Sequence, residues 1–283
     1  MRLSLSQVLS ESFGFFFANT RLFFHLVTIP WIMSIVIRIV GGLVSESPIA
    51  AMVEKAVDVV PTTMFMVAWQ RLVLLGPHRI DGLPGLTWSS RETAWLGHLL
   101  KVAGMTFVLM AIFMVTVGPM DPRALQAGAA IDPDTARRYA LAGPLALGFI
   151  VSLLLALRVS YGLAATAVDV PFSPRFSWVH SRGNAWPIIG ALFVVYFGGA
   201  FVTAVAALLT HGIMRGVLQG DEAAAVVSWT VAILVAYGVT AITATMQAVI
   251  FRRLFAWREG VGLPAVTESS SAPFLATHVP LPR

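Results

Sequence analysis

The sequence contains no cysteine and few charged residues. The lack of cysteine excludes disulfide bonds, thiolate metal sites and cysteine nucleophiles. Only 12% of the residues are charged, about half the share found in soluble domains. Hydrophobic residues make up 57%, and the mean hydropathy is +0.81. This composition excludes a soluble globular enzyme and an intrinsically disordered chain, and it predicts an all-α polytopic membrane protein.

Six apolar stretches are long enough, or nearly long enough, to cross a bilayer, which takes about 20 residues as a helix. The second stretch is the weakest, because only twelve uncharged residues separate Asp58 from Arg71. We expect one membrane domain over residues 1–258, built as three helical hairpins, and a disordered cytoplasmic tail over 259–283. The expected spans are residues 22–45, 56–75, 102–120, 139–157, 185–210 and 223–251.

The basic residues indicate how these spans are oriented. With six spans and a cytoplasmic N-terminus, thirteen of the 19 Lys and Arg residues fall in cytoplasmic segments and five fall outside. Such an excess on the cytoplasmic side is the rule for membrane proteins. We therefore expect both termini in the cytoplasm, a bacterial inner membrane as the location, and the lipid bilayer as the main partner. Other membrane proteins or a second copy are further candidate partners, and nucleic acid is not.

A short amphipathic stretch precedes each span that enters from the cytoplasm. These stretches lie around residues 5–16, 88–99 and 172–182, with aromatic and aliphatic residues on one face. Each is expected to form a helix in the membrane interface. Arginines also close the second, fourth and sixth spans. Two interpretations remain open: three copies of one repeated unit, or the pattern that any membrane protein shows at its cytoplasmic helix ends.

Two segments resemble a known family. In residues 158–197, an Arg ends a span, small residues lead to an acidic residue, and a Ser-Trp pair opens the next span. This outline is similar to that of the YciC-like bacterial inner-membrane proteins and the related membrane domain of glycerophosphoryl diester phosphodiesterases. The matching residues are Arg158, Asp169, Ser177, Trp178 and Trp186. The segment VAWQRLVLLG, residues 67–76, resembles one in alphaproteobacterial membrane proteins. The resemblance implies a multi-span inner-membrane protein and brings no defined activity.

The sequence departs from the phosphodiesterases where their chemistry resides. In that family, activity belongs to an appended soluble barrel with a His-Arg-Gly start and paired carboxylates on a metal. Here His78 and Arg79 are followed by Ile80, and no Glu-x-Asp pair occurs. Every stretch between the expected spans is also far shorter than the ~250 residues of such a barrel. We therefore expect no phosphodiesterase activity.

Arg38 is a charged residue inside the first expected span. Charges within a membrane are costly and are often functional, although an Arg near a helix end can extend to the headgroups. Glu46, Glu54 and Asp58 are candidate partners, and a pair with Asp58 is the one that charge reversal tests most directly. A functional role, a structural ion pair and simple extension to the headgroups all remain open.

Four further polar positions lie at the expected cytoplasmic surface. Arg71, Arg158 and Arg253 end spans, and Asp169 follows a run of small residues. Asp169 either lines a polar cavity or, more simply, caps the turn before Pro171. Convergence of these side chains on one cavity would indicate a functional site. Separate positions in headgroups or water would indicate structural roles.

No catalytic, cofactor or metal site is expected. The six histidines are scattered without a close pair, and a zinc site needs three or four converging ligands. Asp121, Asp132 and Asp134 fall short of the six or more oxygen ligands that a hard cation takes, and Pro133 favours a solvated turn.

Small and polar residues in the last two expected spans favour helix contacts. Gly198 and Gly199 offer a small-residue face for close packing. The polar residues of these spans are sufficient for contacts between helices and too few for an ion relay; they are Thr203, Thr230, Thr240, Thr243, Thr245 and Gln247.

These features favour a membrane scaffold or accessory protein without enzymatic activity. A small-solute or lipid transporter is the alternative, and polar residues should then meet in a cavity between spans. A lipid-modifying membrane enzyme is the third candidate, and it should gather titratable groups at one mouth. A deep polar cavity would favour the transporter.

Overall fold

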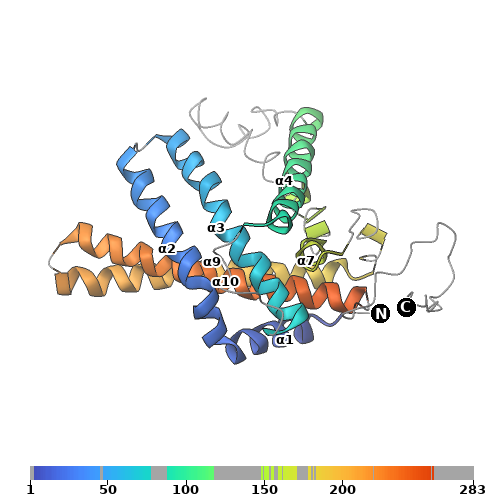
Figure 1. Ribbon diagram of the computed structural model, residues 1–283. Coiled ribbons are helices and arrows are strands. Elements are labelled where there is room, and N and C mark those ends of the chain that lie inside the picture. The colour runs from blue at the N-terminus through green and yellow to red at the C-terminus, as the bar shows by residue number, and fades with distance from the viewer. Residues whose placement is uncertain are drawn as a thin grey trace, which may run out of the picture.

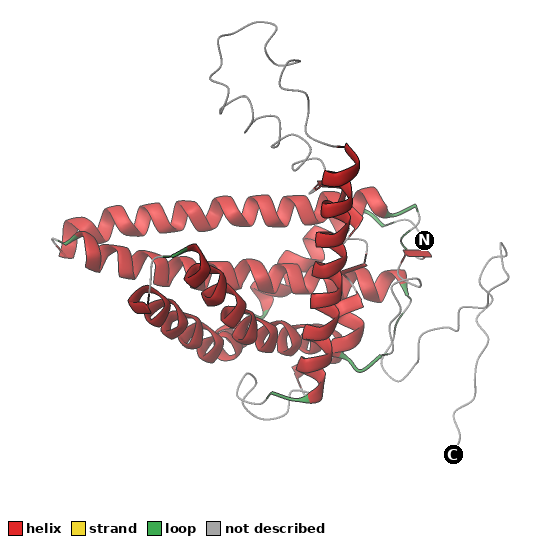
Figure 2. Ribbon diagram, turned by 90° about the horizontal axis from the view of Figure 1, so that it is seen from above, coloured by secondary structure: helices red, strands yellow, loops and turns green. Residues whose placement is uncertain are grey.

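The computed structural model describes residues 3–44, 47–77, 88–117, 162–170, 183–218 and 220–255, together with residues 178, 179, 181 and 257 and short pieces between 148 and 160. Every element within these ranges is a helix (Figures 1 and 2). Four helices are long and apolar enough to cross a membrane, which indicates a membrane protein. The all-helical prediction is therefore confirmed for the described residues.

Two helices form the N-terminal part of the chain, α1 (Leu5–Ala18) and α2 (Thr20–Val44). Asn19 separates them, because its side-chain amide and its backbone N–H both donate to carbonyls at the end of α1. The amphipathic stretch around residues 5–16 is thus a helix of its own, as expected. Helix α2 corresponds to the expected span 22–45 and continues through Pro30.

Helix α3 (Pro48–Leu75) begins earlier than residue 56, where the sequence prediction placed the second span. Ser47 caps its N-terminus by accepting a hydrogen bond from the Ala50 N–H at 3.2 Å, and Pro48 occupies the first helical position. Both are start signals of helices. The extra turns place Glu54 within the helix.

Helix α4 (Ser90–Val117) corrects the prediction for the next segment. An interfacial helix over 88–99 and a separate span over 102–120 were expected, and they form one continuous helix as far as Val117. Leu100 and Lys101 join the two parts because both residues favour helix. The span 139–157 and the stretch 172–182 lie largely outside the described residues, so the three-hairpin arrangement stays a prediction.

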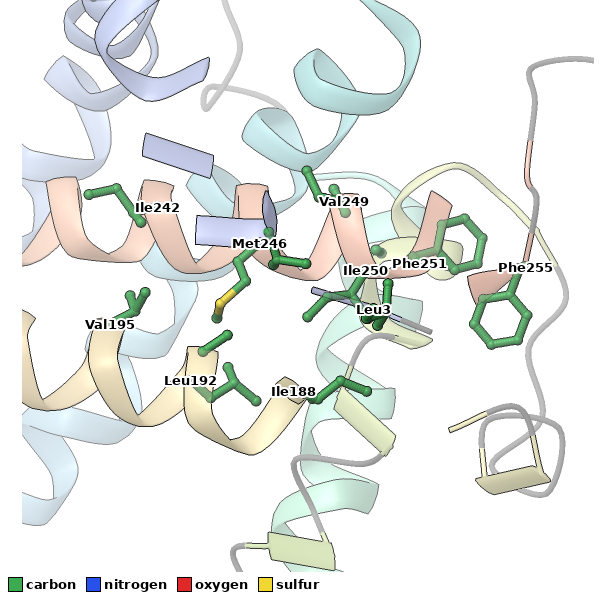
Figure 3. Packing of buried hydrophobic residues seen from close by; sticks show 14 of the residues in the cluster. Leu3, Ile188, Leu192, Val195, Ile242, Met246, Val249, Ile250, Phe251 and Phe255 are labelled. Carbon is green, nitrogen blue, oxygen red and sulfur yellow. The ribbon is translucent and has the colours of Figure 1, made fainter. Parts of the chain in front are cut away.

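The longest helices are α9 (Ala185–Leu218) and α10 (Asp221–Leu254), which pack along each other as an antiparallel pair. Their buried contacts include Ile188 and Leu192 of α9 and Met246 of α10 (Figure 3). Gly199 lies close to α10, since a Cβ there would meet Cγ1 of Val239 at 2.3 Å. Close packing was expected of both glycines, and it holds for Gly199 alone, because Gly198 faces open space.

Helix α10 is the centre of the arrangement, because it contacts α1, α2, α3, α9 and the short buried helix α7 (Gly162–Ala167). The antiparallel pair α2–α3 crosses the pair α9–α10 (Figure 1). The two pairs lie together near α1 and diverge toward their tips. We call the region near α1 the joined end and the region toward the tips the divergent end.

Candidate functional site

A pocket of about 270 Å³ lies between the two helix pairs toward the divergent end. Helices α2, α3, α9 and α10 all contribute to its lining. Four charged side chains share this one pocket, which places ionisable groups between helices that are otherwise apolar. Its polar lining consists of Ser34, Arg38, Glu54, Lys55, Asp58 and Thr203, and Trp229 adds an aromatic side chain.

Helical spacing explains why these groups share the pocket. Ser34 and Arg38 are four residues apart on α2, as Glu54 and Asp58 are on α3, and residues with that spacing lie on the same face of a helix. The facing surfaces of the antiparallel pair therefore combine both sets. This spacing is a signal in the sequence that could have identified Ser34 as a site residue.

Arg38 forms an ion pair with Glu54. Its Nη1 donates to both carboxylate oxygens of Glu54, at 3.0 Å to Oε1 and 2.9 Å to Oε2. Lys55 Nζ lies 3.9 Å from Oε1 of the same carboxylate. The Glu54 side chain is 7% exposed, whereas the side chains of Arg38 and Lys55 are 51% and 74% exposed. One buried carboxylate therefore holds two cations whose outer parts remain accessible.

Of the candidate partners named for Arg38, Glu54 is the one that binds it, whereas Asp58 binds Ser34. The Ser34 hydroxyl donates to Oδ1 of Asp58 at 2.5 Å. The Tyr237 hydroxyl lies 2.8 Å from Ser34 Oγ and 3.3 Å from the carbonyl oxygen of Pro30. Because Ser34 gives its single proton to Asp58, the Tyr237 hydroxyl acts as the donor toward Ser34 or Pro30. Glu46 lies outside the described residues.

The joined end contains a buried network of uncharged polar groups. The Trp95 indole N–H donates to Gln70 Oε1 at 2.9 Å, and Gln70 Nε2 donates to Gln247 Oε1 at 2.9 Å. Nearby, the Trp69 indole donates to Thr245 Oγ1 at 2.8 Å. All five side chains are buried. The network joins α3, α4 and α10, so the expectation of helix contacts is confirmed for Thr245 and Gln247. Trp95, from the stretch 88–99 expected in the membrane interface, is buried within the protein.

Two arginines meet Asp169 beside α7. Arg91 Nε lies 3.1 Å from each Asp169 carboxylate oxygen, and Arg71 Nη1 lies 3.7 Å from Oδ2. Arg71 also donates to the carbonyl oxygen of Ala167 at 3.2 Å. The Asp169 side chain is 61% exposed. The ion pairs therefore link α3 and α4 to the end of α7, a role that the turn-capping interpretation did not include; Pro171 lies outside the described residues.

Arg253 binds a different partner. Its Nη2 lies 2.6 Å from Oε2 of Glu11, and its Nη1 donates to Gln7 Oε1 at 3.2 Å. Arg252 also contacts Glu11. These bonds attach α1 to the end of α10. Arg253 and the Arg71–Asp169 pair thus bind separate groups, and Arg158 lies outside the described residues, so the convergence of all four positions is not observed.

His98 is a titratable group near the N-terminal end of α4. Burial lowers its pKa below the usual value of 6.5, and the nearby charge of Lys101 lowers it further. His98 Nδ1 lies 3.0 Å from the Thr166 hydroxyl of α7. The neutral imidazole is therefore the form that the folded protein favours.

Among the described residues, no group of three His, Asp or Glu side chains is placed to hold a metal ion. The segment with Asp121, Asp132 and Asp134 lies outside those residues. The pocket at the divergent end therefore remains the candidate site. Its chemistry, two exposed cations and two carboxylates, suits binding of a small charged ligand.

No protein-family model, no curated protein sequence and no solved structure matches this chain. Membership of the YciC-like family therefore stays a prediction. The fold and the geometry of the pocket are the basis for the function that follows.

Proposed function

We propose that this chain is an integral protein of a bacterial inner membrane with six spans and both termini in the cytoplasm. Support comes from the four apolar helices, α2, α3, α9 and α10, and from the basic residues concentrated on one side. The outer surface of α9 carries large apolar side chains, such as those of Phe197 and Phe201, which are 67% and 65% exposed. Lipid tails would cover such a surface, whereas water would not favour it.

Topology is tested with single-cysteine variants, because the chain has no native thiol. Ser47→Cys, between α2 and α3, should react with a membrane-impermeant maleimide in intact cells. Ser89→Cys, before α4, should react only after the membrane is permeabilised. The reverse pattern would overturn the proposed orientation, and equal labelling of both variants in intact cells would overturn the odd number of crossings between them.

We further propose that the protein binds and moves a small solute or a lipid, as a transporter does. The single observation that carries this proposal is the pocket between the helix pairs, in which Arg38, Glu54, Lys55 and Asp58 meet. The sequence alone favoured a scaffold or accessory role, and a polar cavity was the feature that would change this order. Charges placed among membrane-spanning helices face cavities and pathways more often than lipid.

Access to the pocket is the test of this function. Ala232 lines the pocket, and an Ala232→Cys variant should react with a small water-soluble thiol reagent in native membranes. Phe197→Cys, at an exposed apolar position on α9, is the matched control and should stay unreactive behind lipid. An Ala232→Cys variant that reacts only after SDS denaturation would mean a closed pocket, and the scaffold role would then be favoured.

The two remaining candidates have less structural support. A lipid-modifying enzyme should gather titratable groups at one mouth, and Glu11 and Asp169 each bind two arginines at separate places in the fold. The oxygens of these two carboxylates are already occupied by guanidinium groups, which hold the side chains in place. The scaffold role has the exposed face of α9 in its favour, which lipid tails would occupy equally well.

A further inference from the structure

We propose that the pocket selects a zwitterion that carries a phosphate and an ammonium group joined by a short linker. This is the chemistry of phosphoethanolamine, either as a free solute or as the headgroup of phosphatidylethanolamine. The inference rests on the proposed ligand-binding function and names its substrate class. It is carried by two oppositely charged poles that lie side by side on α2 and α3.

The first pole is positive. Arg38 and Lys55 share the single carboxylate of Glu54, which leaves one uncompensated positive charge. Both cationic side chains are more than half exposed, whereas Glu54 is buried. An incoming phosphate can therefore reach donors of both cations without breaking the Arg38–Glu54 pair. Arginine and lysine are the usual phosphate-binding side chains.

The second pole is negative. Asp58 accepts one hydrogen bond from Ser34, which is a neutral group, so its charge is not compensated by that partner. The Tyr237 hydroxyl is hydrogen-bonded to Ser34 Oγ and holds it in place. Asp58 lies one helical turn from Glu54 on the same face of α3, a rise of about 6 Å along the axis. Anionic and cationic ligand groups joined by a short linker can thus bind both poles at once.

The remaining lining and the volume of the pocket limit the size of the ligand and favour an ammonium group. Trp229 lines the pocket, and aromatic rings attract ammonium groups. At about 270 Å³ the pocket is slightly smaller than the range for drug-sized ligands. This volume suits a headgroup, whereas acyl chains would have to lie outside, along apolar helix surfaces.

Binding to the full-length protein in a non-ionic detergent tests the inference by titration calorimetry. The soluble probes are O-phosphoethanolamine, inorganic phosphate and ethanolamine. Phosphoethanolamine should bind about 10-fold or more tightly than either single-charge probe, because it alone contacts both poles. Dihexanoyl phosphatidylethanolamine and dihexanoyl phosphatidylglycerol are the lipid probes. Binding of the lipid without binding of soluble phosphoethanolamine would assign a headgroup site, and comparable binding of both would assign a solute site.

Variants separate the two poles. Asp58→Asn should weaken the binding of phosphoethanolamine about 10-fold and leave the affinity for phosphate unchanged. The substitution removes only the negative pole, and the Asn side chain still accepts the Ser34 hydrogen bond. Lys55→Gln should weaken the binding of both phosphoethanolamine and phosphate. Asp221→Asn is the matched control, since it alters a carboxylate in the exposed Arg215–Asp221 pair at the start of α10, outside the pocket lining. Thermal melting of each variant checks folding, and Asp58→Ser, which also removes the charge, replaces Asp58→Asn if that variant does not fold.

The outcomes distinguish this inference from the function on which it rests. Equal affinity for phosphate and phosphoethanolamine would overturn the zwitterion and leave a simple anion pocket. An Asp58→Asn variant with unchanged affinities would overturn the negative pole. Absence of binding by every probe, with Ala232→Cys still reactive, would overturn the substrate class and leave the open pocket. An unreactive Ala232→Cys would overturn the pocket function itself.

Discussion

The two ends of the helix assembly differ in the charge and in the burial of their polar groups. At the joined end, Gln70, Gln247 and Trp95 are uncharged, buried and bonded to one another. At the divergent end, the polar groups are charged, and the side chains of Arg38 and Lys55 are more than half exposed. Groups that satisfy one another fix how helices pack, whereas accessible charges remain available to a ligand. The joined end is therefore structural and the divergent end is the candidate site.

The largest expected effect is at the joined end, with Gln70→Leu. This change leaves the Trp95 indole N–H without an acceptor and Gln247 Oε1 without its donor. Each orphaned buried group costs about 1–3 kcal/mol, so the two together should lower the free energy of unfolding by about 2–6 kcal/mol. Equilibrium unfolding of the detergent-solubilised protein by SDS titration measures the loss.

A double variant isolates the hydrogen bond from the general effect of the substitution. Gln70→Leu combined with Gln247→Leu should destabilise by about 0.5–3 kcal/mol less than the sum of the single changes, since the two amides are direct partners. Strict additivity would contradict the structural role of this network.

Gly199→Ala should have the next largest effect, between α9 and α10. The new methyl group would lie 2.3 Å from Val239 Cγ1 and 3.2 Å from its Cβ. The helices must therefore separate, at a cost of about 1–3 kcal/mol in the free energy of unfolding. Gly198→Ala meets nothing within 4 Å and should instead stabilise its helix by about 0.5–1 kcal/mol. Equal melting temperatures for the two variants would refute the close approach.

Gly41→Ala should act on the divergent end with a smaller effect on stability. The added methyl group would lie 2.8 Å from Glu54 Oε2, so the carboxylate must move away from Arg38. A flexible side chain can yield, so we expect a loss of at most about 1 kcal/mol together with weaker ligand binding. Gly42→Ala, with open space around it, is the control for both thermal melting and titration. Unchanged affinity in Gly41→Ala would contradict a role of Glu54 in ordering the pocket.

The smallest effect concerns pH. The pKa of His98 is lowered by burial and by Lys101, so the unfolded chain binds a proton more readily than the folded protein. Stability should therefore fall as the pH drops from the unfolded value of 6.5 toward the lower folded pKa. His98→Gln should remove this part of the pH dependence. Melting curves collected between pH 5 and pH 8 compare the two proteins, and identical slopes would exclude His98 as the cause.

Apolar runs were sufficient to predict the class of fold. They identified the segments of α2, α3, α9 and α10, because a long uncharged stretch has few alternatives to a helix. The first turns of α3 were missed, since Glu54, Lys55 and Asp58 interrupt the hydropathy. The Ser47–Pro48 start signal was present and marks the true beginning of that helix.

The sequence named Glu54 among the candidate partners of Arg38, but it did not predict which residues meet at the joined end. Gln70 and Gln247 are 177 positions apart, and no local pattern specifies which face of α10 meets α3. The pocket could not be predicted for the same reason, because Trp229 and Arg38 line one pocket only when the two helix pairs cross. Arg38 was recognised as a residue of interest with Glu54 among its candidate partners, and the choice between Glu54 and Asp58 depended on where α3 begins.

The length of the α9–α10 pair has a consequence for its tip. Each helix has 34 residues and extends about 51 Å, whereas a hydrocarbon core is only ~30 Å thick. In the proposed topology, the end of α9 and the start of α10 emerge into the aqueous phase even at a steep tilt of ~40°, and the exposed Arg215–Asp221 pair lies at this tip. An epitope inserted between Leu218 and Gly220 would then be reached by antibodies from outside the bilayer without disturbing either end of the assembly.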